Sequence, residues 1–373
     1  MTYMLPSVDE LEVSLFGPGY GESVLLHIGE GNWIIIDSCI DQNSGEPAAL
    51  QYLKNIGVDP SKNVKLVIAT HWHDDHVRGL GKILQECKEA IFVCPVAIKT
   101  KEFTKLIERS KSRNILNSDN GVCEFTSIIN TLRQRKTPPK YAIADRKIWH
   151  YTPKDGSALA ECTIHSLSPS DAEVEKALNS LSKLIPKLGA DPIRIPPPPQ
   201  NDCAVVLWVN MGPENILLLG SDLEESGNNQ TGWSAVLNLQ IENNGKASIF
   251  KVAHHGSTNG HHQPVWDEML NQSPCVLITP FTRGKKTLPS QNDIDRIIGQ
   301  TEHAYITAPS KKNKKVKQRD VFVKKIISQY TLSIKNSEPE CGQIKMRRVL
   351  RSPVAMDWDI ELFGGASQLI NET

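Results

Sequence analysis

The sequence predicts an α/β fold in which helices cover a sandwich of strands. Short apolar runs of strand length recur along the 373 residues. Stretches between several of these runs place apolar residues at helical spacing. The run "VKLVIAT" at 64–70 is nearly all apolar, as in a strand buried on both faces. A hydrophobic content of 39%, against 23% charged residues, supports a large core and excludes global disorder.

The first half of the chain alternates predicted strands and helices. Strands at 23–28 and 32–38 flank the turn "GEG" and predict a hairpin, preceded by a strand at 11–16. Residues 45–58 predict a helix that ends at Gly57. After the strand at 64–70, apolar residues recur at helical spacing: Val77, Leu80, Ile83, Leu84 and Cys87. A further strand is expected at 90–95.

The second half continues the alternation, which favours an α/β sandwich over an all-α or all-β fold. One or two helices are expected between 100 and 135, and an apolar stripe from Val174 to Ile185 predicts another. Four consecutive prolines at 196–199 predict an extended connector, because proline cannot donate to a β-ladder. Further strands are expected at these positions: 160–169, 203–209, 215–222, 247–257, 274–280, 343–350 and 358–365.

Composition narrows the class of protein without naming a partner. Lys plus Arg and Asp plus Glu are each 42, so the zero net charge gives no general preference for nucleic acid. The eight cysteines form no C-x-x-C pair, which predicts buried, reduced thiols and a cytoplasmic chain. The N-terminus lacks the basic start of a signal peptide. No apolar run reaches the roughly 18–20 residues that span a bilayer.

The strongest functional signal is "THWHDDHVRGL" at 70–80. His71 and His73 are spaced to bind one metal ion, and Asp75 and His76 to bind a second. Imidazole and carboxylate ligands suit zinc or manganese. The alternative, a polar loop whose aspartate caps a helix, requires one aspartate but does not explain three histidines.

Two later strands also end in potential ligands. "LLLGSDLEE" ends a strand at Ser221 and Asp222, and "FKVAHHGSTNG" ends another at His254 and His255. Ligands at strand ends can converge on one edge of a sandwich. Asp222 is the natural carboxylate to reach both ions. Either cluster alone would be weak evidence, but their order and strand context make the set specific.

These motifs resemble the metallo-β-lactamase superfamily. "HWHDDH" is similar to its HxHxDH signature, and "GPGYGESVLLHIGEGNWIIIDSC" to its opening strands. "FKVAHHGS" and "NDCAVVLWV" resemble a subgroup, the hydrolase-like domain of competence DNA-uptake proteins of the ComEC type. The likeness covers roughly 11–308, interrupted near 98–150. It implies an αββα sandwich at 1–310 with a helical insertion at about 98–150, followed by a basic, strand-rich C-terminal extension at 311–373.

The resemblance also assigns roles to residues of this chain. His71 and His73 would hold one ion, Asp75 and His76 the second, with Asp222 between them. His255 is the preferred last ligand, because the family's final histidine often precedes glycine, and His254 stays open as the alternative. Asp37 would orient a ligand histidine. Catalytic roles fall on Asp75 and Asp222, and on Asp74 for proton transfer, although Asp74 also suits the first turn of a helix.

The sequence departs from the superfamily pattern at one expected ligand of the first ion. Many superfamily members carry a further histidine in a loop before the strand of the bridging aspartate, where this chain reads "PQNDCAV". Asn201 or Asp202 would stand in for it, or a water molecule would, and Asp202 is counted among the supporting residues. The expected cofactor is therefore zinc or manganese, with one or two ions per chain.

The predicted activity is that of a metal-dependent phosphodiesterase or nuclease acting on DNA or RNA, since a bound metal generates hydroxide from water at neutral pH. Substrate binding is assigned to Lys285 and Lys286 in "RGKK" and to Ser257 beside the paired histidines. The run "KKNKKVKQR" at 311–319 has two equally open interpretations, a contact with phosphate groups and a solvated basic loop. Two alternatives remain. One is a hydrolase of a small phosphoester, lactone or thioester. The other is a metal-stabilised interaction module of a multi-protein system, such as one for defence, binding a protein partner through 311–373.

Overall fold

Two large mixed sheets form the centre of the molecule. The computed structural model describes residues 4–99, 103, 121–157, 159–184, 200–212, 214–239, 245–282, 287–310, 341–350 and 358–370. Within these ranges the first sheet has eight strands, in the spatial order β17 (Asp359–Phe363), β16 (Gly342–Val349), β1 (Glu10–Gly17), β3 (Ser23–His27), β4 (Trp33–Ile36), β6 (Val64–Ile68), β7 (Ile91–Pro95) and β8 (Lys140–Ala142).

The second sheet also has eight strands among the described residues. Their order is β18 (Ser367–Leu369), β15 (Ala304–Ile306), β14 (Leu270–Ile278), β13 (Ala247–Lys251), β12 (Ile216–Leu219), β11 (Leu207–Asn210), β10 (Cys162–Ser166) and β9 (Arg146–Tyr151). Both sheets contain a parallel block, β4-β6-β7-β8 in the first and β12-β13-β14-β15 in the second. A two-stranded ribbon joins β2 (Tyr20–Gly21) to β5 (Cys39–Ile40).

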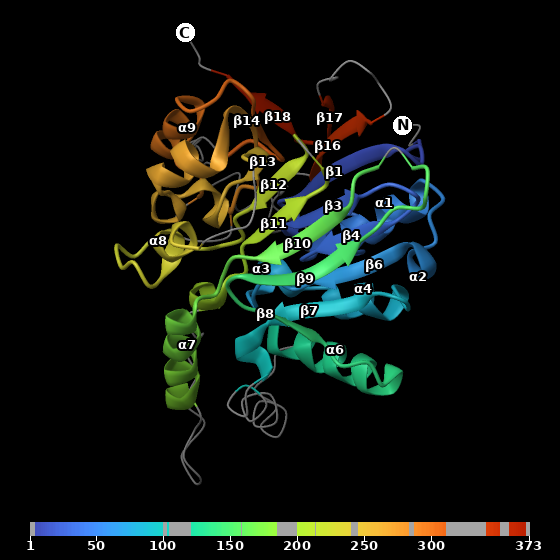
Figure 1. The fold of residues 1–373 in the computed structure, drawn as a ribbon, viewed down its shortest axis with the longest axis horizontal. Coiled ribbons are helices and arrows are strands. Elements are labelled where there is room, and N and C mark those ends of the chain that lie inside the picture. Colours follow the sequence, from blue (N-terminus) through green and yellow to red (C-terminus); the bar gives the residue numbers. More distant parts are fainter. Residues whose placement is uncertain are drawn as a thin grey trace, which may run out of the picture.

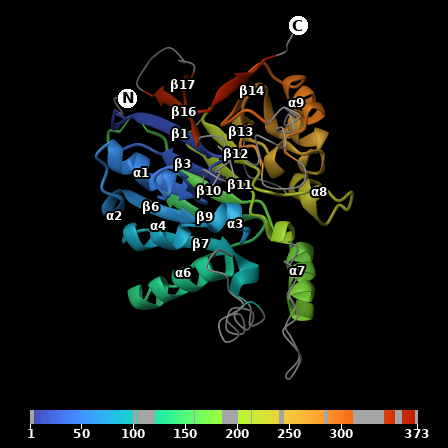
Figure 2. The ribbon, with the colours of Figure 1, turned by 180° about the vertical axis from the view of Figure 1, so that it is seen from behind.

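Helices cover the outer face of each sheet (Figure 1). Beside the first sheet lie α1 (Ala48–Asn55), α2 (Pro60–Asn63), α4 (Leu80–Glu86) and α6 (Gly121–Arg135). Beside the second lie α8 (Gly232–Leu237) and α9 (Gln291–Ile298), and the reverse view shows the same arrangement (Figure 2). The helix α7 (Asp171–Leu184) extends from one end of the sandwich in both views. This αββα order confirms the fold class predicted from the sequence.

The alternating strand pattern explains why the layers stack in this way. In β4, Trp33 and Ile35 pack with the helices α1, α4 and α6, whereas Ile34 and Ile36 pack between the two sheets. Side chains of a strand point alternately to its two faces, so an all-apolar strand must be covered on both. A third apolar cluster, including Trp233 of α8, packs between the second sheet and its own helices. The strand at 64–70 is likewise buried, as predicted.

Most predicted elements coincide with observed ones, and two differ. The strand expected at 203–209 begins only at Leu207, because Val205 leaves the ladder and its N–H bonds to the carbonyl of Thr70 at 3.0 Å. The segment expected to be a helical insertion at 98–150 contains α6 but ends in β8 and β9 at the edges of the two sheets. Part of that insertion, the proline connector at 196–199 and the basic run at 311–319 lie outside the described residues.

The last strands of the chain complete both sheets. β16 pairs antiparallel with β1 over the full length of both, from Glu10 opposite Val349 to Gly17 opposite Gly342. β17 extends the same sheet, and β18 pairs with β15 in the second. The strand-rich part of the predicted C-terminal extension therefore lies within the sandwich. No helix in the described ranges is long and apolar enough to cross a membrane.

His27 is a buried histidine far from the polar clusters of the sequence motifs. The side chain is 1% exposed, its Nδ1–H donates to the carbonyl of Glu10 at 2.8 Å, and its Nε2 accepts from Gly31 N–H at 3.1 Å. Burial, together with the positive charge of Arg347, lowers the pKa of His27 from 6.5 to about 4 despite the bond to Glu10. The ring therefore stays neutral in the folded protein at neutral pH.

Acid should destabilise the protein through His27. The contribution of the neutral ring is complete above pH 6.5 and is lost as the pH falls to about 4, because only the unfolded chain takes up the proton in that range. The loss amounts to about 3 kcal/mol. Urea unfolding of the wild type and His27→Gln across this range would measure it. Parallel pH profiles for the two proteins would contradict the assignment.

Candidate metal centre

The potential ligands gather where the parallel strands end. Asp37 follows β4, and His71 and His73 follow β6 just before the short helix α3 (Asp74–Val77). Asp222 follows β12, and His255 follows β13. The carboxyl ends of parallel strands are the usual binding edge of such sheets. The two sheets thus bring residues from both halves of the chain to one edge, as the sequence predicted.

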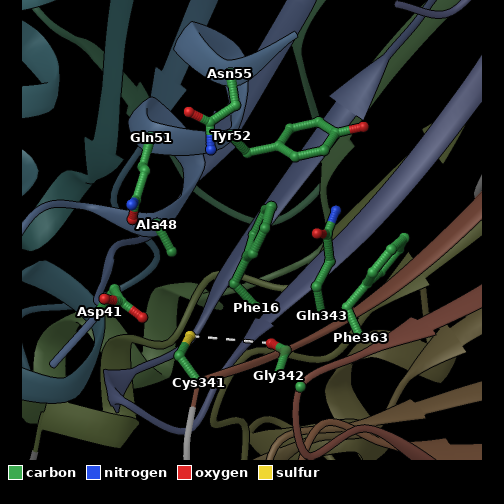
Figure 3. Close-up of a pocket in the computed structure, with 11 residues that line it drawn as sticks. Phe16, Asp41, Ala48, Gln51, Tyr52, Asn55, Cys341, Gly342, Gln343 and Phe363 are labelled. Atoms are coloured by element: carbon green, nitrogen blue, oxygen red, sulfur yellow. Dashed lines mark hydrogen bonds between the residues drawn. The ribbon is translucent and has the colours of Figure 1, made fainter. Parts of the chain in front are cut away.

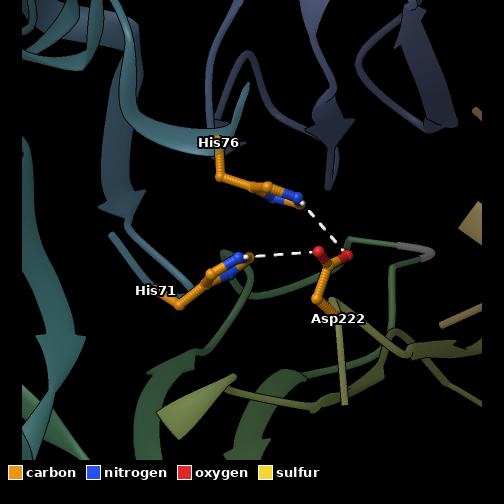
Figure 4. Close-up of side chains that lie close together, drawn as sticks. All are labelled: His71, His76 and Asp222. Carbon is orange, nitrogen blue, oxygen red and sulfur yellow. Dashed lines mark ion pairs between the residues drawn. The ribbon is translucent and has the colours of Figure 1, made fainter. Parts of the chain in front are cut away.

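Asp222 lies at the middle of the cluster (Figure 4). His71 and His76 point toward it from the first sheet, with His71 Nε2 3.7 Å from Oδ2 and His76 Nε2 3.4 Å from Oδ1. His255 Nε2 approaches the same carboxylate at 3.9 Å and Asp75 Oδ2 at 3.4 Å. Two donor groups result on the Nε2 side of His76, one of His71, His76 and Asp222, the other of Asp75, His76 and His255, and a third, of Glu22, Asp37 and His76, lies on the Nδ1 side of the same ring.

The donor atoms fit a metal ion. His76 Nε2 and Asp222 Oδ1 are completely buried, face each other at 3.4 Å and have no hydrogen-bond partner. Buried polar atoms are nearly always hydrogen-bonded, so an imidazole nitrogen and a carboxylate oxygen that face each other without a hydrogen bond are suited to bind a cation. His73 Nδ1 lies 3.0 Å from His71 Nε2, which places a further nitrogen at this group. A set of imidazole and carboxylate donors matches zinc or manganese chemistry.

A set of oxygen atoms holds the second nitrogen of each ligand histidine. Asp37 Oδ2 accepts from His76 Nδ1 at 2.8 Å, and both Asp37 oxygens accept from Thr70 at 2.7 Å. Thr70 Oγ1 contacts His71 Nδ1 at 3.0 Å, and His255 Nδ1 donates to the carbonyl of Thr279 at 3.0 Å. Such partners fix the ring orientation and tautomer of ligand histidines. Asp37 thus occupies the orienting position expected of it.

Backbone strain is concentrated at this edge. Asp37, Ser221, His254 and His255 all have left-handed backbone angles, with φ of 58°, 47°, 47° and 55°. Non-glycine residues adopt this region at a cost of about 1–3 kcal/mol and do so most often at functional sites. At the paired histidines the effect is to separate the side chains. His255 turns into the cluster, while His254 Nδ1 contacts Asn259 Oδ1 at 3.1 Å and Glu224 Oε1 at 3.2 Å.

Burial and neighbouring charges set the protonation of the cluster. Burial lowers the pKa of His71 well below its ordinary value. Burial would do the same to His76, but Asp222 and Asp37 face its two ring nitrogens and raise its pKa well above the ordinary value. Burial opposes ionisation of Asp222, yet His76 and His255 outweigh it and hold its pKa well below the usual range. Asp222 is therefore an anion suited to serve as a metal ligand.

The remaining predicted site residues lie around this centre. Asp74 opens α3, where a carboxylate is favoured. Ser257 is 5% exposed and its hydroxyl donates to Asn259. Asp202 pairs with Lys176 of α7 at 2.8 Å, so its Oδ1 is engaged away from the histidines. Lys285 and Lys286 lie outside the described residues. Proton transfer by Asp74 and substrate binding by Ser257 stay predictions.

Sequence reasoning missed three residues that contact the ligand histidines, Thr70, Thr279 and Glu22, and a fourth, Lys251, that pairs with Glu22. Thr70 and Thr279 each come at the end of an apolar run. Thr70 acts through its hydroxyl and Thr279 through its backbone carbonyl, and no sequence motif reveals either contact. Glu22 and Lys251 form a buried ion pair behind His76 and His255. The available signal was a charged residue next to a run of buried apolar positions, in "GYGES" and in "IFKVA".

A separate pocket of about 230 Å³ opens between α1 and the start of β16 (Figure 3). Phe16, Tyr52 and Phe363 supply aromatic rings and Gln343 an amide, while Cys341 lies at its base, with its Sγ 3.7 Å from Cys39 Sγ. Its lining residues are distinct from the histidine cluster. In the described part of the chain, seven cysteines are in no disulfide and five of them are buried, while their reduced state stays a prediction.

Comparison with known proteins agrees with this geometry. Residues 16–120 match the metallo-beta-lactamase superfamily. The matched segment carries Asp37, His71, His73, Asp75 and His76, and ends before Asp222 and His255. The match and the donor set together support a metal-dependent hydrolase. The likeness to the ComEC subgroup stays a prediction. No curated protein matches the chain.

Solved metallo-beta-lactamases are similar to the chain at low identity. One, from Cronobacter sakazakii (Enterobacter sakazakii), is a HARLDQ motif mutant with 15% identity and a TM-score of 0.34, over 65% of this chain and 77% of its own. The enzyme SMB-1 bound to 2-mercaptoethanesulfonate shows 12% identity and a TM-score of 0.32, over 72% and 81%. MEM-A1, from a soil metagenome library, shows 11% identity and a TM-score of 0.32, over 72% of this chain and 87% of its own. Likeness at this level carries no argument about substrate.

Proposed function

We propose that the chain is a metal-dependent hydrolase that cleaves phosphodiester bonds of nucleic acid. The observation that carries the metal-dependent part is the orphaned pair of donor atoms, His76 Nε2 and Asp222 Oδ1, buried 3.4 Å apart between two histidine-carboxylate groups. A hydrogen-bonded structural cluster would leave neither atom without a partner.

The residues of the site fall into those that would bind the ions, those that orient the ligands and those that line the access to the site. His71, His73 and Asp222 would hold one ion, and Asp75, His76 and His255 a second, sharing Asp222. Such ions lower the pKa of water and stabilise charge developing at phosphorus. Asp37, Thr70 and Thr279 keep the rings oriented. Access is through a shallow recess beside Asp75 and His255, where the Phe281 ring stacks on His255 at 5.3 Å.

The proposal that the substrate is a nucleic acid rests on features of the sequence. "FKVAHHGS" resembles a subgroup concerned with DNA uptake, and the basic segments at 283–286 and 311–319 would supply phosphate contacts. The paired carboxylates and imidazoles suit an in-line displacement between two ions. Small phosphoesters, lactones, thioesters and β-lactams are the competing substrates that the scaffold would accommodate.

A substrate panel tests the proposal. Metal content is measured by elemental analysis on protein loaded with zinc or manganese. The same protein is then given single-stranded, double-stranded and supercoiled DNA, RNA, a nitrophenyl phosphodiester, a lactone, a thioester and a β-lactam. We expect cleavage of nucleic acid that a chelator abolishes and added metal restores. Bound metal with turnover confined to a lactone, thioester or β-lactam would contradict the nuclease. A protein that takes up no metal would contradict the whole proposal.

A further inference from the structure

An ion pair without solvent contact lies directly behind the metal centre. Glu22, between β2 and β3, is 3% exposed, and Lys251, the last residue of β13, is 1% exposed. The Lys251 ammonium pairs with Glu22 Oε1. Removing two charges from water costs several kcal/mol per ion, which their attraction barely recovers, so apolar side chains here would serve stability equally well. A pair of this kind calls for a role other than stability.

Glu22 faces the two histidines of the second donor group. Its Oε1 lies 3.8 Å from His76 Nδ1 and its Oε2 3.7 Å from His255 Nδ1. These nitrogens already bond to Asp37 and to the carbonyl of Thr279, and Glu22 Oε2 itself has no hydrogen-bond partner. The carboxylate is thus held close to both rings without taking their protons. The Glu22 main chain is fixed as well, since its N–H donates to the carbonyl of Asp75 at 3.0 Å.

Lys251 connects Glu22 to the loop of the shared ligand. Its ammonium also donates to the carbonyl of Ser221 at 3.3 Å. Ser221 precedes Asp222, has a strained φ of 47°, and accepts a second bond from His254 N–H at 2.9 Å. One ammonium therefore joins the β2–β3 turn, the loop that carries Asp222 and the strand that leads to His255.

The positive charge of Lys251 also offsets part of the negative charge around the ligand histidines. Asp37, Asp75, Asp222 and Glu22 surround His76 and His255 with carboxylates. Lys251 pairs with Glu22 and so neutralises one of these four carboxylates. If the ammonium were absent, Glu22 would compete with Asp37 and Thr279 for the ring N–H groups and turn the rings away from the ion.

Resting on the proposed metal centre, we propose that Glu22 and Lys251 are positioning residues that orient His76, His255 and Asp222 for the second ion. In this proposal both residues act on the ligands, and neither is assigned as a ligand of the ion. Their joint loss should weaken binding of the second ion by about 10- to 100-fold, the usual effect of removing partners that orient metal ligands.

A double replacement separates positioning from stability. Lys251→Met alone leaves a buried uncompensated carboxylate and is expected to destabilise the fold strongly. Glu22→Gln/Lys251→Met removes both charges with little change in shape and should recover most of that loss. Zinc affinity is measured by competition with a chromophoric chelator, and the ligand geometry by the visible absorption of the Co²⁺-substituted protein. We expect the folded double variant to bind its second ion about 10- to 100-fold more weakly, with an altered cobalt spectrum.

A second buried ion pair provides the control. Glu12, 0% exposed, pairs with Arg347 at 2.8 Å between β1 and β16. Glu12→Gln/Arg347→Met should change stability but leave both metal readouts as in the wild type. If Glu22→Gln/Lys251→Met binds zinc with the wild-type affinity and shows the wild-type cobalt spectrum, this inference is overturned but the proposed function is not. A wild-type protein that binds no metal would overturn this inference together with the proposed function.

Discussion

Asp222→Asn is expected to remove most of the metal and nearly all of the activity. The substitution keeps the shape of the side chain but removes the charge that His71, His76 and His255 all face, at 3.4–3.9 Å. Loss of a residue that merely orients a ligand already costs about 10- to 100-fold, so loss of the shared ligand should exceed about 100-fold in hydrolysis rate. Elemental analysis and rate measurements on the same preparation would test both effects.

Asp267→Asn is the matched control, because this aspartate is exposed and its carboxylate accepts a hydrogen bond from the surface residue Gln263, while its backbone carbonyl, which the substitution keeps, accepts one from Lys246. It should retain the wild-type metal content and rate. Circular dichroism would establish that both variants fold. A folded Asp222→Asn protein with its full metal content and an unchanged rate would refute the central position of this carboxylate.

Gly21→Ala should unfold or severely destabilise the protein. Gly21 has φ of +104°, and a methyl group at its Cα would overlap the backbone carbonyl of Asp75. Backbone cannot move aside as a flexible side chain can. Left-handed strain of about 1–2 kcal/mol and overpacking of about 1–3 kcal/mol add to an expected loss of about 2–5 kcal/mol. Urea unfolding would measure it, and any folded fraction should bind metal weakly because Asp75 is displaced.

Gly45→Ala isolates the backbone component of this effect. Gly45 also has positive φ, at +70°, but nothing lies within 4 Å of the added methyl. Its cost should be about 1–2 kcal/mol, with metal binding unchanged. Equal losses in the two variants would show that the contact with Asp75 is unimportant, and that the glycines of "GPGYG" serve only the turn.

The sequence predicted local features well. β4 and β6 were recognisable because every position except Lys65 is apolar, which requires cover on both faces. The spacing of His71, His73, Asp75 and His76 is a local motif, and three of these residues do lie in the two donor groups. Asp37 was expected to orient a histidine and contacts His76 Nδ1 at 2.8 Å.

Features that depend on distant contacts were not predictable. Glu22 and Lys251 stand far apart in the chain, and although each adjoins an apolar strand, nothing in the sequence shows that the two pair with each other. The late start of β11 depends on Val205 pairing with Thr70, which no propensity encodes. The strand at 343–350 was expected, but its partner β1 could not be deduced, since many antiparallel arrangements suit one apolar pattern.

The pairing of β1 with β16 has a consequence for biosynthesis. β1 leaves the ribosome well before its neighbour β16, because their paired residues Gly17 and Gly342 stand 325 positions apart in the sequence. At ordinary translation rates, one edge of β1 stays unpaired for on the order of tens of seconds. During that time a strand with buried, apolar positions from Leu11 to Phe16 offers its free N–H and carbonyl groups to other nascent chains. This protein should therefore depend on chaperones during translation, and its slow step in folding should be the arrival of its last strands.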